Sequence, residues 1–306
     1  MVRKRRPAPP NRLQPPTAEP GLPSLGFLEE FTRGSLSQWR SAGKNLERFS
    51  KTLFFDLEKH RAQHSDELVD AIRSSTKGPF EFRGWARIVD YRYSMEPLSM
   101  EGSLRGDGGR FNIGRMLNPA AYTPFPSLYV AEDFPTAFRE RFGLDRDVAT
   151  NGLTAGELVL RRETSFTSIA LDGRVDCYLD VGDVDSLKAT AEVLRCFQMP
   201  STIPAQARQL RLKPPGLVRT AQGLQRQLLS RTWRLEPAQY DLPANSQIFG
   251  RLCSAAGVHA ILYPSTRDDT RRCLALVPQN WKDSDSFVEL QGQVPESVQV
   301  RRLDGK

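Results

Sequence analysis

The chain has few histidines and cysteines and no long apolar run, and each shortage excludes a class of protein. Its 306 residues include three histidines and four cysteines. No stretch approaches the roughly 18 consecutive apolar residues of a membrane-spanning helix. The basic start MVRKRRPAPP is not followed by the apolar segment of a secretory signal. We therefore expect a protein that is made in the cytoplasm and stays there.

The cysteines form no recognisable redox or metal motif. They are widely spread and none belongs to a CxxC pair, which disfavours a zinc ribbon and a thioredoxin-like site. A disulfide framework for a chain of this length would need more of them. We expect reduced, mostly structural thiols at Cys177, Cys196, Cys253 and Cys273.

Two of the three histidines have a spacing found in metal sites. His60 and His64 stand at i and i+4, which places two imidazoles on one helix face. However, the sequence HRAQH lacks the general-base glutamate of a zinc protease, and no obvious third ligand follows. The pattern favours two surface histidines, so we expect no metal. With His259 as the third, histidine-based catalysis is poorly supplied.

Positive charge is in modest excess, at +7 from 43 basic and 36 acidic residues. No signature of a DNA- or RNA-binding module accompanies it. Much of the excess precedes the first acidic residue, Glu19, in the form of Arg3, Lys4, Arg5, Arg6 and Arg12. A basic nucleic-acid-binding adaptor is therefore a disfavoured interpretation.

Three regions follow one another along the chain. Residues 1–23 contain seven prolines and little to bury, so we expect a disordered or extended arm. Residues 24–78 are predicted to be a helical extension, because apolar side chains recur at three- and four-residue spacings. A break near His64 predicts a second helix with Ser65 or Asp66 as its N-cap. Residues 79–303 are predicted to form one α+β domain.

Short β-type runs and helical stretches are interleaved in the third region. The predicted strands cover residues 85–89, 127–130, 157–160, 167–171, 259–263 and 273–276. The predicted helices cover residues 135–142, 184–197, 217–229 and 246–256. This mixture indicates the α+β fold class.

Clustered glycines mark the segment GDGGRFNIG from Gly106 to Gly114. Glycine lets backbone N–H groups approach a phosphate, and the adjacent Arg110 is able to fork onto phosphate oxygens. The segment has neither the GK[ST] of a P-loop nor the GxGxxG order of a dinucleotide fold. A phosphate cradle and a tight turn with a structural arginine are about equally compatible with it.

A buried strand and a helix meet between Leu128 and Glu140. The helix is predicted to begin with Asp133 as N-cap and Pro135 in its first turn. Glu140 is then the i+3 neighbour of Ala137, which allows it to face the strand ends. Residue type alone favours the competing interpretation, in which Glu140 pairs with an arginine on the surface.

A late apolar strand ends in Tyr263-Pro264-Ser265, where the chain leaves the sheet. Small hydroxyl residues just past a strand end occur at ligand sites and equally often as turn caps. By itself, this segment does not discriminate between the two.

Taken in this order, the segments resemble the RES domain family. The family pattern has an early Tyr/Trp-x-Arg strand, GGR[WF]N, a strand ending in Tyr, a helix with a glutamate and a late Tyr-Pro-Ser. The matches are Trp85-Ala86-Arg87, Gly108-Gly109-Arg110-Phe111-Asn112, Leu128-Tyr129 with Glu140, Asn245-Ser246-Gln247 before the last helix, and Tyr263-Pro264-Ser265. The resemblance covers about residues 80–280. No aromatic residue directly precedes Arg87, where the family often has one.

The resemblance implies a toxin of a two-gene toxin–antitoxin system, with a fold like that of ADP-ribosyltransferases. Studied members destroy NAD⁺ by hydrolysis or phosphorolysis, so NAD is the expected substrate. The expected partner is a helix-turn-helix antitoxin that blocks the NAD⁺ pocket. A homo-oligomer and inorganic phosphate as co-substrate are compatible with this expectation, and no membrane partner is expected.

The resemblance also implies residue roles. Glu140 is expected to stabilise an oxocarbenium-like transition state and to orient the attacking water or phosphate. Arg110 and Tyr129 complete the expected catalytic set, with Tyr129 against the nicotinamide ribose. The expected substrate-binding set is Arg87, Gly108, Gly109, Arg110, Asn112, Tyr129 and Ser265, in which the arginines bind the pyrophosphate and Ser265 bonds to the nicotinamide end or a phosphate.

Two alternatives stay open beside NAD⁺ cleavage. Some relatives transfer ADP-ribose to a protein, although the chain lacks the Glu-x-Glu motif of the best-known enzymes of that kind. The other alternative is the basic adaptor, which would bind nucleic acid through residues 1–23 and the helical extension.

Overall fold

A computed structural model gives the fold of residues 33–118, 121–144 and 165–306. The chain divides into two compact units, residues 1–44 and residues 45–306, and the fold described below is that of the second. The predicted arm, residues 1–23, and the predicted strand 157–160 lie outside the described residues. Among the described helices, none is both long and apolar enough to span a membrane.

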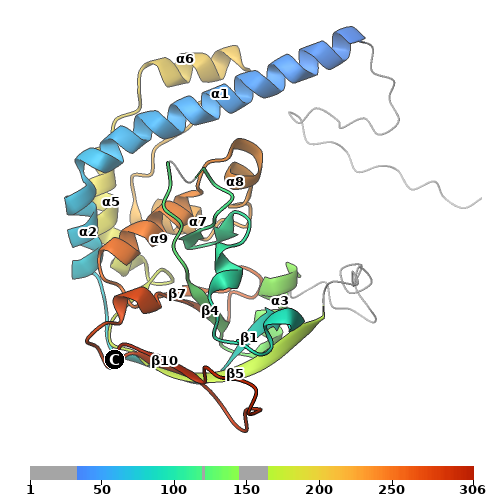
Figure 1. The fold of residues 1–306 in the computed structure, drawn as a ribbon. Coiled ribbons are helices and arrows are strands. Elements are labelled where there is room, and N and C mark those ends of the chain that lie inside the picture. Colours follow the sequence, from blue (N-terminus) through green and yellow to red (C-terminus); the bar gives the residue numbers. More distant parts are fainter. Residues whose placement is uncertain (1–32, 119–120, 145–164) are drawn as a thin grey trace, which may run out of the picture. The chain divides into compact units, whose positions relative to one another are not determined.

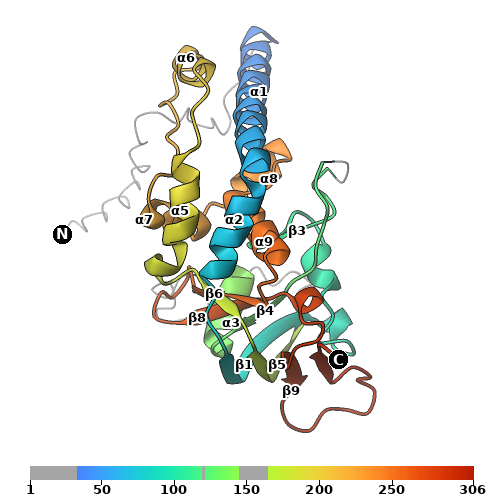
Figure 2. The ribbon, with the colours of Figure 1, turned by 90° about the vertical axis from the view of Figure 1, so that its left-hand side faces the viewer.

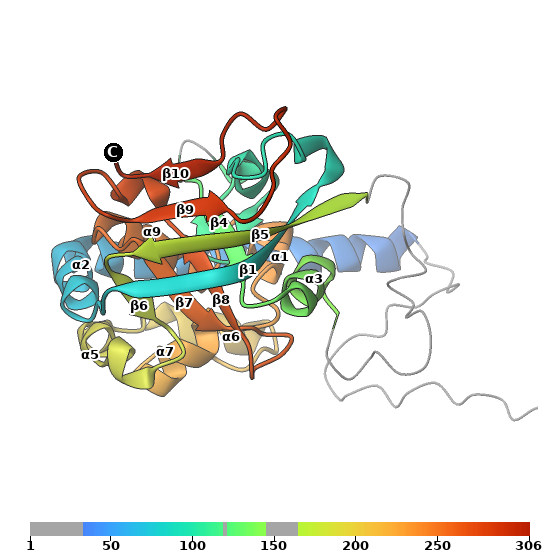
Figure 3. The same ribbon diagram turned by 90° about the horizontal axis from the view of Figure 1, so that it is seen from below.

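A mixed sheet organises the second unit (Figure 3). In the described part of the chain it has eight strands in the order β10-β9-β5-β1-β4-β8-β7-β6, and all neighbours are antiparallel except β6 and β7. The strands are β1 (Phe80–Asp90), β4 (Leu128–Ala131), β5 (Phe166–Val175), β6 (Tyr178–Asp180), β7 (Ala260–Pro264), β8 (Arg272–Leu276), β9 (Phe287–Leu290) and β10 (Arg302–Asp304). Five of the six predicted strands are confirmed, whereas β6, β9 and β10 were not predicted.

Helices lie over one face of this sheet (Figures 1 and 2). They are α2 (Ser65–Ser74), α5 (Lys188–Arg195), α7 (Ala221–Leu228) and α9 (Asn245–Ala255), and α2 contacts both α5 and α9. The other helices are α1 (Arg33–Gln63), α3 (Phe134–Phe142), α6 (Thr202–Gln209) and α8 (Leu235–Tyr240). The four predicted helices of the α+β region are confirmed within a few residues. The α+β fold class with a helical N-terminal extension is therefore confirmed.

Both faces of the sheet are buried, because side chains alternate along each strand. Ala86 of β1 belongs to the apolar cluster under the helices, together with Phe249 of α9. Its neighbour Trp85 belongs to the cluster on the opposite face, where Leu98 and Trp281 cover the strands. The position of a residue along its strand thus determines which face of the sheet its side chain lies on.

The predicted break in the helical extension is confirmed, since α1 ends at Gln63 and α2 begins at Ser65. The predicted N-cap is wrong, because His64 takes that position and makes no side-chain cap. The backbone N–H of His64 still bonds to the His60 carbonyl, and the His64 carbonyl accepts from Leu68. The break is thus too slight to need a capping side chain.

Phe197 packs against both histidines of the HRAQH segment. The ring centroids of His60 and His64 lie 5.4 and 5.7 Å from that of Phe197, and both pairs are stacked. His64 Nδ1 also lies 2.9 Å from Glu67 Oε2. These contacts give the two imidazoles a packing role in joining α1 and α2 to the chain after α5.

All four cysteines are free thiols, as the absence of CxxC pairs predicts. Cys253 and Cys273 are buried, and burial raises the pKa of both thiols. Structural thiols of this kind stay protonated and unreactive at neutral pH.

Candidate active site

The glycine-rich segment folds into a tight hairpin of β2 (Gly108–Gly109) and β3 (Asn112–Ile113). Gly109 pairs with Asn112, which leaves Arg110 and Phe111 as a two-residue turn. Gly108 has φ +97°, a conformation that disfavours any residue with a Cβ. A Cβ on Gly108 would also lie 2.4 Å from the Asn112 carbonyl oxygen, so the hairpin requires glycine at this position.

Asn112 and Tyr129 hold this hairpin against β4. The Oδ1 atom of the fully buried Asn112 accepts from the Gly109 N–H and from the Tyr129 hydroxyl, both at 2.9 Å. The Tyr129 oxygen in turn accepts from the Phe111 N–H at 2.9 Å. Burial raises the pKa of Tyr129, so its hydroxyl keeps the proton that it donates.

Gln247 of α9 hydrogen-bonds to the backbone of the same hairpin from the other side. Its Nε2 atom donates to the carbonyls of Asp107 at 2.7 Å, Gly109 at 3.1 Å and Asn112 at 3.0 Å. The helix comes so close that a Cβ on Gly250 would lie 2.0 Å from the Phe111 carbonyl oxygen. The resemblance includes Gln247, but its role was not predicted.

Arg110 extends from the turn into a buried polar site. Its Nη1 atom donates to the carbonyls of Leu228 at 3.2 Å and Ser230 at 2.8 Å, and its Nη2 atom donates to Thr266 Oγ1 at 3.0 Å. Arg110 is 7% exposed. Burial lowers the pKa of its guanidinium, and the nearby charge of Glu140 opposes that shift. The arginine stays protonated at neutral pH because its pKa starts so high.

Glu140 lies next to this arginine in the last turn of α3. Its Oε1 atom accepts from the Ser265 hydroxyl at 2.6 Å and from the Thr266 N–H at 2.8 Å. Its Oε2 atom accepts no hydrogen bond from any residue that the structure describes. The side chain is half-buried and forms no ion pair within the described ranges, so the interpretation as a surface ion pair is wrong.

Ser265 caps the turn that follows β7 and also bonds to Glu140. Its hydroxyl donates to Glu140 and accepts from the N–H groups of Arg267 at 3.1 Å and Asp268 at 3.2 Å. With 1% exposure, the side chain is a turn cap that also holds the carboxylate. Its hydrogen-bonding capacity is taken up by these three partners, since a hydroxyl offers one donor and two acceptor sites.

Ion pairs fasten α3 and the strand before it to the loop that carries Ser265. Asp133 caps α3 as predicted, accepting from the Thr136 N–H at 2.8 Å, and pairs with Arg271 at 3.2 Å. Further along the helix, Arg139 pairs with the buried Asp268 at 3.1 Å. These contacts keep Glu140 and its two donors in one rigid corner of the fold.

Further arginines lie near Arg110, and sequence reasoning missed most of them. Arg234 lies with its guanidinium 4.6 Å from the Trp233 ring centroid, and Trp233 also contacts Arg110. Burial lowers the pKa of Arg234, and the charges of Arg141 and Arg267 lower it further. These arginines therefore form a positively charged group, and the charge of Glu140 acts on its member Arg110. Trp233 beside an arginine, at the end of a long segment between motifs, was the signal available in the sequence.

Arg87 is not part of this group. It alternates with Ala86 and Ile88 in β1 and so points to the face of Trp85, opposite to the face that Tyr129 packs on. Its Nε, Nη1 and Nη2 atoms donate to the carbonyls of Pro97, Tyr129 and Ser99 at 3.1, 3.2 and 2.8 Å. Burial lowers the pKa of Arg87 to about 10. This geometry supports a role in bracing β1 against β4 rather than in contacting a ligand.

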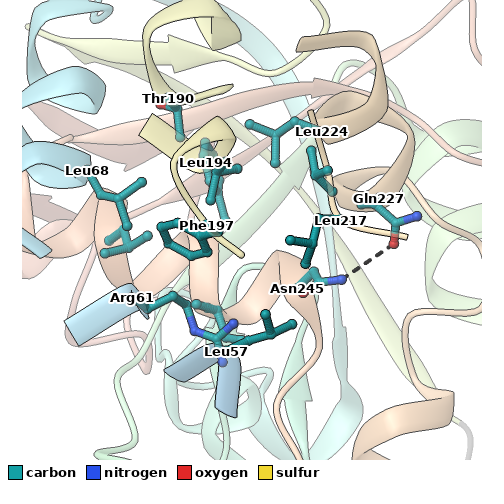
Figure 4. Close-up of a pocket in the computed structure, with 14 residues that line it drawn as sticks. Leu57, Arg61, Leu68, Thr190, Leu194, Phe197, Leu217, Leu224, Gln227 and Asn245 are labelled. Atoms are coloured by element: carbon teal, nitrogen blue, oxygen red, sulfur yellow. Dashed lines mark hydrogen bonds between the residues drawn. The ribbon is translucent and has the colours of Figure 1, made fainter. Parts of the chain in front are cut away.

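A pocket with about 670 Å³ of empty space, including its open mouth, lies apart from these residues (Figure 4). Its one charged wall is Arg61, which donates to Glu58 at 2.6 Å. Side chains of α1, α2, α5, α7, α9 and of the chain between α5 and α7 form the rest, including Leu57, Leu68, Leu194, Phe197, Leu224, Ile248 and Leu252. Helix α9 thus presents one side to this pocket and another to the hairpin.

Comparison with known proteins identifies the family. Among solved structures, the M. tuberculosis MbcT–MbcA toxin–antitoxin complex contains a similar chain, with 15% sequence identity and a TM-score of 0.42 over 74% of this chain and 91% of that one. No curated protein sequence matches. The RES domain model matches residues 85–296, which is more than half of the chain and includes every residue of the expected site. The resemblance is thereby confirmed, and this protein belongs to the RES domain family.

Proposed function

We propose that this protein is a toxin-like enzyme that cleaves the nicotinamide–ribose bond of NAD⁺. The observation that carries the proposal is the fixed carboxylate of Glu140, held through one oxygen, with the charged Arg110 nearby and Arg234 next to that arginine. Such a site suits a ligand that has an anionic pyrophosphate and a cationic nicotinamide ribose.

In the proposed reaction the C1′–N bond breaks and nicotinamide leaves as a neutral molecule with the bonding electron pair. Glu140 stabilises the positive charge that develops on the ribose through its Oε2 atom, while Oε1 stays bonded to Ser265 and Thr266. Water or inorganic phosphate then bonds to C1′ and gives up a proton. The products are ADP-ribose or its 1-phosphate, together with nicotinamide.

Arg110 is proposed to attract the pyrophosphate by its charge, because its Nη1 and Nη2 atoms already donate to the protein. Arg234, which lies near Arg110, is proposed to bind the pyrophosphate directly together with Arg267. Gly108 and Gly109 are proposed to bring the hairpin backbone toward it, with Tyr129 below the nicotinamide ribose. The bonds of Asn112, Ser265 and Arg87 to the protein itself support positioning roles for these three members of the expected set. The proposed chemistry requires no metal.

Measurement of NAD⁺ after brief expression, in cells and with purified protein, tests the proposal. Glu140→Gln keeps the shape of the side chain and removes its charge, so we expect a loss of about 10²–10³-fold in the cleavage rate. The matched control is Glu192→Gln, since Glu192 is an exposed carboxylate on α5. Loss of NAD⁺ that persists in Glu140→Gln would exclude the role of Glu140.

Product analysis separates the acceptors. ADP-ribose indicates water, its 1-phosphate indicates phosphate, and label from NAD⁺ on a polypeptide would support the alternative of protein ADP-ribosylation. Steady NAD⁺ with salt-sensitive nucleic-acid binding would instead favour the basic adaptor. We further propose that a helix-turn-helix antitoxin covers the site, which co-expression and co-purification of a neighbouring gene product would test.

A further inference from the structure

We infer that Thr266 is a positioning residue whose hydroxyl bridges Arg110 and Glu140 and keeps the two charges apart. This inference rests on the proposed function for its catalytic consequence, whereas the bridge itself stands on the contacts of the folded chain. Neither the family pattern nor the expected site includes this residue.

Thr266 touches both charged groups of the site. Its backbone N–H donates to Glu140 Oε1 at 2.8 Å, and its Oγ1 atom accepts from Arg110 Nη2 at 3.0 Å. The same hydroxyl points its proton toward Glu140 Oε1 over a longer distance of 3.4 Å. One side chain therefore links the arginine of the hairpin turn to the carboxylate of α3.

The hydroxyl occupies the place that a direct ion pair would take. Opposite charges in a partly buried site attract strongly, and the charge of Glu140 acts on Arg110 although the described ion pairs include none between the two. The Leu228 and Ser230 carbonyls hold the arginine on its far side. A direct pair would neutralise the carboxylate that the developing oxocarbenium charge needs. Thr266 thus keeps the negative charge of Glu140 available.

Threonine suits this position because its branched Cβ restricts the rotation that aims the hydroxyl. Valine has the same shape but offers neither the acceptor for Arg110 nor the proton for Glu140. The shorter of the two bonds from Thr266 to Glu140 comes from the backbone N–H, so a valine side chain leaves it intact. Thr266→Val therefore removes the bridge alone.

Steady-state kinetics of NAD⁺ cleavage test the catalytic consequence. We expect Thr266→Val to lower kcat about 10–100-fold with little change in KM, because the bridge connects two charged groups. Thr266→Ser should restore most of the rate, and Thr76→Val, at the end of α2, should leave it unchanged. Wild-type kcat in Thr266→Val would overturn the inference. A raised KM with unchanged kcat, or a serine variant as slow as valine, would do the same.

A double-mutant cycle in urea unfolding tests the bridge without activity. Thr266→Val, Glu140→Gln and the double variant should give non-additive shifts in unfolding midpoint, since contacting residues couple. Additive shifts would overturn the bridge. If the wild type does not cleave NAD⁺ and the cycle is non-additive, the proposed function fails and the bridge stands.

Discussion

At the scale of single residues, most polar side chains of the motifs use their hydrogen-bonding atoms within the protein, whereas Glu140 keeps one oxygen for a ligand in the proposed function. Asn112 uses both its oxygen and its amide nitrogen within the protein, donating to the carbonyls of Ser103 at 2.8 Å and Phe125 at 3.1 Å. The Tyr129 hydroxyl likewise bonds to the hairpin, accepting from the Phe111 N–H and donating to Asn112 Oδ1. Glu140 differs, because one of its oxygens has no described partner. A free acceptor near the fixed Arg110 is the property that makes Glu140 the reactive group in the proposal.

Ser265 is the residue on which the orientation of that carboxylate depends most. Replacement by alanine removes the 2.6 Å bond to Glu140 and leaves the N–H groups of Arg267 and Asp268 without their acceptor. We expect Ser265→Ala to lower kcat of NAD⁺ cleavage about 10–100-fold and the free energy of unfolding by about 1–3 kcal/mol. Kinetics and urea unfolding of the purified variant measure both.

The control for this prediction is Ser74→Ala, an exposed serine at the end of α2 that bonds to the Ala71 carbonyl. Ser74→Ala should leave kcat unchanged and should change the free energy of unfolding by less than about 0.5 kcal/mol. An unchanged rate in Ser265→Ala would show that Glu140 is held well enough by the Thr266 N–H alone.

At the scale of elements, the β2–β3 hairpin is the part that brings the site together. It carries Arg110 at its turn and is gripped by β4 through Tyr129 and by α9 through Gln247. The grip depends on the absence of a side chain at Gly109, where a Cβ would lie 2.5 Å from the Tyr129 hydroxyl and 2.6 Å from Asn112 Oδ1. Any side chain there must move the tyrosine, the asparagine or the turn.

We therefore expect Gly109→Ala to lower the free energy of unfolding by about 1–3 kcal/mol, as overpacked sites do, and to abolish most of the cleavage activity by displacing Arg110. Thermal unfolding and NAD⁺ turnover check the two effects. Gly102→Ala is the matched control, because a Cβ there meets nothing within 4 Å in the same region of the chain. Equal behaviour of the two variants would contradict the packing argument.

At the scale of the whole molecule, His259 makes stability depend on pH. It precedes β7 and its Nδ1 atom lies 2.7 Å from Ser286 Oγ, whose oxygen also accepts from the Asp176 N–H. Burial lowers the pKa of His259, although the charge of Asp176 opposes the shift. The folded protein thus favours the neutral imidazole and binds fewer protons than the unfolded chain near the ordinary histidine pKa of about 6.5.

Stability should accordingly be full above pH of about 6.5 and fall as the pH drops through that value toward the lowered pKa of the folded state. Urea unfolding between about pH 5 and 8 measures this slope. In His259→Asn, which retains a polar group without a titrating ring, the slope should be smaller than in the wild type. Identical pH profiles would show that other groups account for the whole effect.

The helical extension and the segment between α5 and α7 belong to the same packed layer. Phe49 and Leu53 of α1 pack against Ile203 and Ala207 of α6. The pocket of Figure 4 lies between these additions and α9, so α9 connects it physically with the hairpin. Helices α1 and α2, which precede the matched family region, therefore help to bury the outer side of α9, the helix that holds the hairpin backbone.

Much of this protein follows from the sequence by itself. The order of the motifs identifies the family and the α+β class, because each motif is a local segment whose residues are adjacent in the chain. Asp133 as a helix cap also follows, since a cap depends on a few neighbouring residues. The break between α1 and α2 is predicted for the same reason, although not its cap. For the glycine cluster around Arg110, the sequence left a phosphate cradle and a tight turn equally open, and the structure shows the turn.

Only the tertiary structure decides which of these residues meet. Period-two alternation shows that Ala86 and Arg87 face opposite ways, but the packing of α9 and the hairpin determines which face Arg110 and Glu140 share, and Arg87 lies on the other face. Thr266 and Gln247 become important because distant segments bring hydrogen-bonding partners to them. Such partners are far apart in the chain, so no local pattern records them.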